Sequence, residues 1–335
     1  MRLLIVTQVI DTEHPVLGFF HRWVEEFAKH GEQVHIICLQ KGKYNLPENV
    51  TVHSLGKEEG RGRWTYLFRF YKCIWQLRHE YDNVFVHMNQ IYVVLGAPFW
   101  RATRKRIGLW YMHGSTPITL KIASYFTHHI FTGSPESCKL ASKKIQVTGH
   151  GIDTDRFFPQ PTAKDLDLIT VGRITEAKNI TALIKVLAEV RASHDVSLTI
   201  VGAAVTKVEQ VHEAKLRALV SDLQLSSAVH FMGRVSQSDL PRVLNRAKVF
   251  VTAAQNGSLD KAILEAMACG IPVVSMAPGS ASLPLNESQV SDVAQLTLQI
   301  KNVLKSGVFI DEEKAAYIKE NHSIASLVPE ILQSY

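Results

Sequence analysis

The sequence predicts an α/β protein with two domains, each built from short buried strands that alternate with amphipathic helices. The chain has 335 residues, which is long for a single hydrophobic core, so two domains are expected. Residues 248–276 show the alternation most clearly: an apolar run at 248–252, a polar turn at 255–258, a stretch of helix formers at 259–269 and a second apolar run at 271–276. Continuous β-branched runs of this kind are typical of strands buried on both faces, as in parallel sheets.

The remaining elements follow from the same two patterns along the chain. In the first half, apolar runs predict strands at 3–7, 34–39, 83–88, 107–112, 130–133 and 145–148. Helical periodicity predicts helices at 19–30 and 61–81, and a short helix that opens at 134–137. In the second half, strands are expected at 166–171, 198–202 and 229–233. Further helices are expected at 180–191, 208–223, 237–246, 290–305, 311–320 and 324–333.

Composition narrows the class of protein. With 46% hydrophobic and 20% charged residues, the chain has the make-up of an ordinary globular enzyme. No apolar run approaches the roughly 20 residues that a membrane-spanning helix needs. The N-terminal stretch has an apolar run but no small-residue cleavage site, so it predicts a first strand and not a signal peptide. The widely spaced cysteines predict reduced thiols and a cytoplasmic location: Cys38, Cys73, Cys138 and Cys269.

The positive charge is concentrated in the first half of the chain. Residues 1–150 contain 19 basic and 11 acidic residues, whereas the remainder is close to neutral. The predicted helix at 61–81 interleaves tryptophan, tyrosine and phenylalanine with arginine and lysine. This pattern fits an amphipathic helix on an anionic membrane surface, and equally a core helix whose cations form its solvated side. Nucleic acid is not an expected partner, because no recognised binding module accompanies the charge.

One motif is missing after the first predicted strand. The loop that follows it contains Gly18 but no G-x-G-x-x-G sequence. A dinucleotide-dependent dehydrogenase is therefore not favoured.

The predicted helix at 259–269 begins beside the expected carboxyl edge of a sheet. Its N-terminus presents unpaired N–H groups and a partial positive charge, which suit a diphosphate. Glu265 lies within this helix among small and apolar residues, where an isolated carboxylate is costly. Two interpretations stay open: Glu265 pairs with Lys261 one turn earlier, or it accepts hydrogen bonds from ligand hydroxyls.

The segment 264–274, LEAMACGIPVV, resembles the signature of the retaining, nucleotide-sugar-dependent glycosyltransferases of family four, the glycosyl transferases group 1. The segment 149–159, GHGIDTDRFFP, is similar to the stretch where that family crosses between its domains. The resemblance implies the GT-B architecture, in which two Rossmann-like domains face a central cleft and a C-terminal helix crosses back to the first domain. It places an acceptor-side domain at 1–158, a donor-side domain at 159–318 and the returning helix at 319–335.

The resemblance also assigns roles on the donor side. In the family a Glu-x7-Glu pair brackets the turn before the signature helix. Glu265 matches the second glutamate, which holds the ribose, whereas Gly257 stands where the first would contact the sugar. Arg173 and Lys178 match the residues that grip the diphosphate, a fitting chemistry because both are phosphate-binding cations. Backbone donors are expected at the helix N-terminus, from Ser258, Leu259, Asp260 and Lys261.

On the acceptor side the resemblance is sparser. Gly18 matches the tail of the family's glycine motif after the first strand, and Phe19 follows it on the acceptor side. His87 and Asn89 stand where the family often has His-x-His, so the resemblance implies that they lie near the donor sugar. His87 is equally compatible with a satisfied core histidine. His113, after the strand at 107–112, is a further candidate for acceptor contact.

The implied function is transfer of a sugar from a nucleoside diphosphate to a glycan or lipid-linked acceptor with retention of configuration. The resemblance implies no metal and no cofactor beyond the nucleotide-sugar substrate. The expected setting is cell-envelope or polysaccharide biosynthesis in the cytoplasm, at the inner face of the membrane. Two alternatives remain: a GT-B epimerase or phosphorylase, and a nucleotide-sugar-binding protein without transferase activity.

Overall fold

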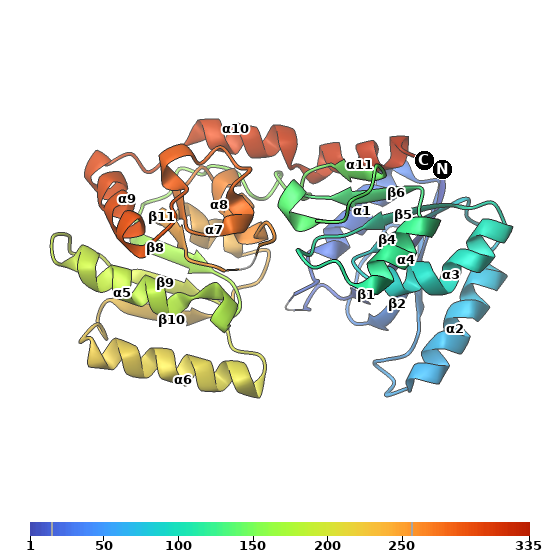
Figure 1. Cartoon of the computed structure of the whole chain (residues 1–335), viewed down its shortest axis with the longest axis horizontal. Helices are drawn as coiled ribbons and strands as arrows, with labels where there is room; N and C mark the ends of the chain where they lie inside the picture. Colours follow the sequence, from blue (N-terminus) through green and yellow to red (C-terminus); the bar gives the residue numbers. More distant parts are fainter. Residues whose placement is uncertain (15, 256) are drawn as a thin grey trace. The chain divides into compact units, whose positions relative to one another are not determined.

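The chain forms two compact units, described here from a computed structural model (Figure 1). The structure describes residues 1–14, 16–255 and 257–335. The first unit comprises residues 1–151 together with 322–335, and the second comprises residues 152–321. The sequence placed the first boundary at 158 and the returning segment at 319, so both divisions lie a few residues from those positions. The predicted α/β class is confirmed.

A parallel sheet forms the centre of the first unit. Among the described residues it has seven strands in the order β3-β2-β1-β4-β5-β6-β7. These strands are β1 (Arg2–Ile10), β2 (Gln33–Lys41), β3 (Val50–Ser54), β4 (Asn83–His87), β5 (Arg106–Trp110), β6 (His129–Thr132) and β7 (Ile145–Val147). Every pairing in the sheet is parallel, as the continuous apolar runs predicted.

Helices cover both faces of this sheet. On one face α1 (Phe20–His30) packs against α11 (Ile324–Gln333), and the two share a core with Phe85, Trp110 and Phe131. The other face is covered by α2 (Arg63–Gln76), α3 (Gln90–Ala102) and α4 (Ile118–Phe126). A short helix, η1 (Pro135–Ser137), lies between β6 and β7 in the chain. The segment 322–335 therefore belongs to the core of the first unit.

Three elements of the first unit were not predicted, and one was predicted too long. Strand β3 is half-exposed and short, so its apolar signal is weak. Helix α3 contains Gly96 and Pro98, which interrupt the periodic pattern, and α4 spans only nine residues. Helix α2 ends at Gln76, not at residue 81, because the chain turns there toward β4.

The second unit has a parallel sheet of its own. Among the described residues its five strands follow the order β10-β9-β8-β11-β12. They are β8 (Leu166–Val171), β9 (Leu198–Val201), β10 (Val229–Gly233), β11 (Ala247–Thr252) and β12 (Val273–Ser275). Its helices are α5 (Ile180–Arg191), α6 (Lys207–Asp222), α7 (Leu240–Asn245), α8 (Lys261–Ala268), α9 (Val293–Ser306) and α10 (Glu312–Asn321), with short helices η2 (Glu176–Lys178), η3 (Pro278–Ser280) and η4 (Asn286–Ser288).

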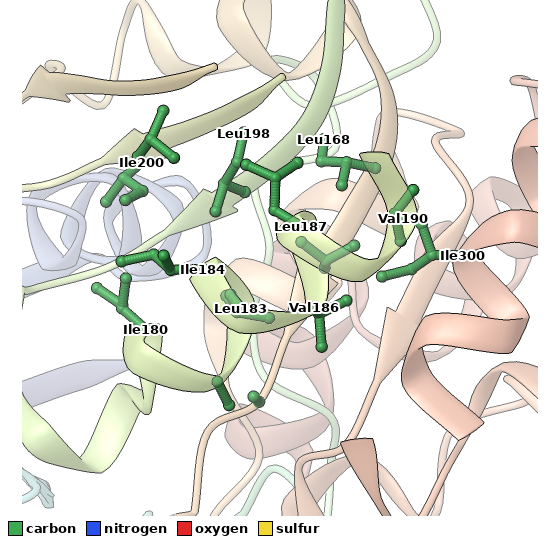
Figure 2. Close-up of a cluster of buried hydrophobic side chains, with 14 of the residues drawn as sticks. Leu168, Ile180, Leu183, Ile184, Val186, Leu187, Val190, Leu198, Ile200 and Ile300 are labelled. Carbon is green, nitrogen blue, oxygen red and sulfur yellow. The ribbon is translucent and has the colours of Figure 1, made fainter. Parts of the chain in front are cut away.

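A large apolar cluster fixes the helices of the second unit on their sheet. Figure 2 shows side chains of α5 meeting Leu198 and Ile200 of β9 and Ile300 of α9. Burial of this α5 surface explains why its bounds coincide with the predicted 180–191: the apolar spacing is regular over three turns. Within the described chain, none of the helices combines the length and apolar character needed to cross a bilayer.

Candidate functional site

Each sheet reverses its direction of winding at one point. In the second unit the chain moves outward from β8 to β9 and β10, then returns to place β11 on the opposite side of β8. The first unit does the same at β1 and β4. In open parallel sheets, ligands bind outside the carboxyl ends of the strands at such a switch point. The loops after β8 and β11, and after β1 and β4, are therefore the candidate sites.

Two glycines allow close contact of the loops after β8 and β9. Gly172 has φ +148° and Gly202 has φ +145°, a region that side chains strongly disfavour. A Cβ on Gly202 would lie 1.8 Å from the carbonyl oxygen of Gly172, and a Cβ on Gly172 would lie 2.5 Å from Cε of Lys178. The lysine stem thus lies directly over the backbone at the end of β8, and no larger residue could replace either glycine without movement.

Lys178 is directed to the N-terminus of α8 by this packing. It ends η2, and its ammonium lies 3.4 Å from the carbonyl oxygen of Val171 and forms an ion pair with Asp260. Asp260 in turn caps α8, since its Oδ1 accepts from the N–H of Ala262 at 3.3 Å. The predicted diphosphate-binding lysine therefore lies beside a helix N-terminus, with a carboxylate as its partner.

Arg173 follows Gly172 and remains half-exposed. Its Nη1 lies 3.5 Å from Oε1 of Glu209 in the first turn of α6. Glu209 also accepts from the N–H groups of Val205 and Thr206 at 2.7 and 3.0 Å, and these backbone bonds hold the pKa of Glu209 below its usual value. Sequence reasoning missed Glu209. The Thr206-x-x-Glu209 spacing of a capping box is the signal that could have found it.

Glu265 is buried on α8 and has a cation as its partner. Its side chain is 3% exposed and forms an ion pair with Lys261 one turn earlier. Burial raises the pKa of Glu265, and the nearby ammonium of Lys261 opposes that effect. Of the two interpretations of Glu265, the structure displays the Lys261 pair. Its role toward ribose stays a prediction.

The start of α8 differs slightly from the prediction. The helix begins at Lys261, so the predicted start at 259 was wrong: Leu259 and Asp260 precede the helix because the Asp260 side chain caps it. A Cβ on Gly279 of η3 would lie 2.2 Å from the carbonyl oxygen of Ser258, so the loop after β12 rests on this turn. Asn256 of the predicted polar turn lies outside the described residues.

In the first unit, the site residues lie at the ends of β1 and β4. Phe19 precedes α1, and its ring meets the ring of His87 edge-on with centroids 6.2 Å apart. A Cβ on Gly18 would lie 2.9 Å from the carbonyl oxygens of His14 and Thr12, so this loop also needs glycine. Asn89 lies at the N-cap of α3 without bonding the helix through its side chain.

His113 is the most exposed of the predicted acceptor-side residues. Its Nδ1 accepts from the N–H of Ser115 at 3.2 Å and lies 2.9 Å from the Ser115 hydroxyl. The structure therefore brings Phe19 and His87 together, while the contacts of His113 are local. The functional roles of all these residues stay predictions.

His87 is a buried histidine at the end of β4. Its Nδ1 lies 3.3 Å from the Thr7 hydroxyl, and its ring stacks on Phe20 with centroids 3.9 Å apart. Its Nε2 has no hydrogen-bond partner among the described residues. Burial, with a smaller effect from His150, lowers the pKa of His87 to about 3. The imidazole is therefore neutral at ordinary pH, as in the core-histidine interpretation.

This burial should make the first unit sensitive to mild acid. Unfolding restores a pKa near 6.5, so between pH 6.5 and 3 the unfolded chain binds a proton that folded His87 does not. Stability is then lost as pH falls below 6.5, by about 1.4 kcal/mol per pH unit. Urea unfolding of the wild type and His87→Gln should be compared at pH 7 and pH 5. The variant should lose less stability than the wild type on acidification; equal losses would contradict a neutral buried His87.

In the parts of the chain that the structure describes, no three His, Cys, Asp or Glu residues gather as ligands for a metal ion. The chemistry available at the second unit's switch point is instead cationic. Lys178, Arg173 and the N–H groups at the start of α8 are positioned by the loops after β8 and β11. Such an arrangement is suited to a diphosphate.

Comparison with known proteins assigns the class. The sequence model of the family described as "Glycosyl transferases group 1" matches residues 151–323, about half of the chain. The chain belongs to this family. The match contains Arg173, Lys178 and the whole of α8, so the switch-point site lies within the family's defining region.

Curated relatives match less than half of the chain. A GDP-mannose-dependent monoacylated alpha-(1-6)-phosphatidylinositol monomannoside mannosyltransferase of Corynebacterium glutamicum is 29% identical over 179 residues, covering 45% of this chain and 45% of the relative. The amylovoran biosynthesis glycosyltransferase AmsK of Erwinia amylovora is 28% identical over 144 residues, covering 40% of this chain and 34% of the relative. The matched part of the chain thus spans less than half the length of these relatives.

Solved structures resemble the whole chain. Anabaena HepE in complex with UDP has a TM-score of 0.81 at 18% identity, covering 100% of this chain and 99% of HepE. HepE in complex with UDP-glucose has a TM-score of 0.79 at 17% identity, with complete coverage of both chains. At this identity the likeness concerns the fold, and it agrees with the GT-B architecture that the sequence predicted.

Proposed function

We propose that the protein is a retaining glycosyltransferase that moves a sugar from a nucleoside diphosphate to a glycan or lipid-linked acceptor. The observation that carries the proposal is the convergence of Lys178, Arg173 and the α8 N-terminus at the switch point of the second unit. Family membership and the UDP and UDP-glucose complexes of HepE support it.

Both proposed phosphate-binding cations have carboxylate partners in the second unit. Asp260 pairs with Lys178, and Glu209 pairs with Arg173. A bound diphosphate would take the place of these carboxylates and accept further bonds from the N–H groups at the start of α8. Positive charge at the leaving diphosphate stabilises the transition state, where negative charge develops on it.

The proposed reaction proceeds on one face of the sugar. The bond between the anomeric carbon and the diphosphate oxygen breaks, and a bond to the acceptor hydroxyl oxygen forms on the same face. The acceptor proton passes to an oxygen of the departing diphosphate. The family resemblance supports this retaining course without a metal or cofactor, with Glu265 on the ribose and Phe19, His87, Asn89 and His113 toward sugar and acceptor.

The setting of the reaction belongs to the same proposal. The relatives act, by their names, on a phosphatidylinositol mannoside and in amylovoran biosynthesis. We infer a related role in cell-envelope or polysaccharide synthesis, in the cytoplasm at the inner face of the membrane.

Calorimetric titration with UDP, GDP and ADP tests the donor site directly. One nucleotide should bind clearly more tightly than the other two, because the ribose and base contacts add to a shared diphosphate contact. Its common sugar conjugates should then release the nucleotide faster when an acceptor is present. Binding of none of the three nucleotides would contradict the proposal.

A second candidate, a nucleotide-sugar-binding protein without transferase activity, is favoured by Gly257. This residue stands where the family has the glutamate that contacts the donor sugar. The two functions differ in turnover, because a binding protein would bind a nucleotide but transfer no sugar. In that case the Gly257→Glu variant should gain transferase activity. Product analysis with the donor alone separates both from an epimerase, which changes the sugar without an acceptor.

A further inference from the structure

Helix α2 presents a row of large apolar side chains to solvent. Trp64, Phe68, Tyr71 and Trp75 follow one another at spacings of four, three and four residues, which places them on one face of the helix. Trp64 is 84% exposed, Phe68 70% and Trp75 58%. The buried residues of the helix are Phe70 and Ile74, so the core uses another part of its surface. An exposed row of this size calls for a partner.

A second row of the same kind lies on α4. Ile118, Ile122 and Tyr125 repeat the spacing of four and three residues, and Ile118 and Tyr125 are 73% and 86% exposed. Leu120 and Ala123 are the buried residues of this helix. Two helices far apart in sequence therefore display apolar rows that the fold itself does not cover.

The two rows belong to one face of the first unit. Helix α3 joins them: the Tyr71 hydroxyl donates to the carbonyl oxygen of Leu95 at 3.0 Å, and Gln90 Nε2 donates to Thr119 Oγ1 at 3.1 Å. Figure 1 shows α2, α3 and α4 side by side on the same side of the seven-stranded sheet. We name this three-helix surface the aromatic face.

The charge of the aromatic face has one sign. Helices α2, α3 and α4 contain no Asp or Glu, and residues 83–135 contain none at all. Exposed cations lie on each helix: Arg63 and Lys72 on α2, Arg101 on α3 and Lys121 on α4. A partner for this face should offer an apolar region to the exposed rings and negative charge to the surrounding cations. An anionic lipid bilayer has both, because its charged headgroups lie over an apolar interior.

We propose that the aromatic face docks on an anionic membrane surface, with Trp64, Trp75 and Tyr125 at the level of the lipid headgroups. Tryptophan and tyrosine favour this interface because their rings are apolar and their polar atoms remain hydrated. A second copy of the chain is a poorer occupant, since a two-fold contact would bring two faces of like charge together. This docking would give the transferase access to a lipid-linked acceptor, and to that extent it rests on the proposed function.

Co-sedimentation with vesicles tests this docking on the full chain. Vesicles of phosphatidylcholine alone are compared with vesicles that also contain phosphatidylglycerol. The wild type should bind the anionic vesicles, and added salt should weaken that binding by screening the cations. Trp64→Ser with Trp75→Ser should lower the bound fraction about tenfold, and Ile118→Ser with Tyr125→Ser should lower it about threefold.

A matched control comes from the second unit. Val208 and Leu298 are 76% and 61% exposed there, so Val208→Ser with Leu298→Ser removes exposed apolar side chains from the second unit and should leave vesicle binding unchanged. Absence of wild-type binding to anionic vesicles, or equal losses in all three double variants, would overturn the proposal. So would a concentration-dependent dimer that only the aromatic-face variants abolish, because the occupant would then be a second copy.

Nucleotide titration of the same variants separates this inference from the proposed function. The aromatic face lies in the first unit, so its variants should keep the wild-type nucleotide affinity. Vesicle binding without any nucleotide binding would contradict the transferase proposal and leave the docking intact. Nucleotide binding without vesicle binding would overturn only the docking.

Discussion

Replacing Lys178 by alanine should lower the rate of sugar transfer at least tenfold. The substitution removes the ammonium group that lies beside Asp260 at the start of α8, where the leaving diphosphate is proposed to gain its negative charge. Steady-state kinetics with the donor identified by titration provide the measurement. The loss should appear in both kcat and kcat/KM, because the lost interaction strengthens in the transition state.

Two further variants make this prediction specific. Lys185→Ala removes an exposed lysine from α5 in the same unit and should leave the kinetics unchanged. Asp260→Asn retains a capping side chain but removes the carboxylate that pairs with Lys178, so nucleotide affinity should rise. Wild-type kinetics for Lys178→Ala would refute its phosphate role, and unchanged affinity for Asp260→Asn would refute competition between the carboxylate and the diphosphate.

Gly202→Ala should destabilise the second unit by about 3 kcal/mol or more, the combined cost of a disfavoured φ and an overpacked site. The new Cβ would lie 1.8 Å from the carbonyl oxygen of Gly172, a distance that neither backbone can accept without moving. Gly307→Ala is the matched control: its φ is +67°, and no atom lies within 4 Å of its added Cβ. That variant should lose only about 1 kcal/mol, the cost of the left-handed conformation itself.

The positions of the tryptophans help to show which unit loses stability in Gly202→Ala. All five tryptophans lie in residues 1–151, so their fluorescence reports the first unit, whereas far-ultraviolet circular dichroism reports both. In urea, Gly202→Ala should shift the dichroism transition more than the fluorescence transition. Equal losses of stability in Gly202→Ala and Gly307→Ala would contradict the close contact between the loops after β8 and β9.

Elements with a regular pattern could be predicted from the sequence, often to the residue. Strands β8 and β10 and helices α5 and α11 have the predicted bounds, and the apolar spacing of α5 is regular over three turns. The missed elements of the first unit lack that regularity. Helix α3 contains Gly96 and Pro98, and β3 lies at a sheet edge where half of its surface is exposed.

The ion-pair partners of the site residues could not be predicted from the sequence. The sequence indicated Arg173 and Lys178 but not Glu209 or the pairing of Asp260 with Lys178, which joins residues 82 positions apart. Burial of Glu265 and His87 was likewise not predictable, although the roles of both residues in the site stay predictions. Glu265 and His87 each had two interpretations, and the difference depends on which distant elements cover them, a property that local pattern does not contain.

The division of the chain also bears on its synthesis. The second unit is continuous, so a ribosome delivers all of residues 152–321 before residues 322–335 emerge. The first unit begins earlier but lacks α11 until then, and with it the side chains that pack on α1 and the Tyr335 hydroxyl bond to the carbonyl oxygen of Val84. The unit that is translated first is therefore the one completed last, and its apolar surface stays open to chaperones for the whole time that the second unit is being made.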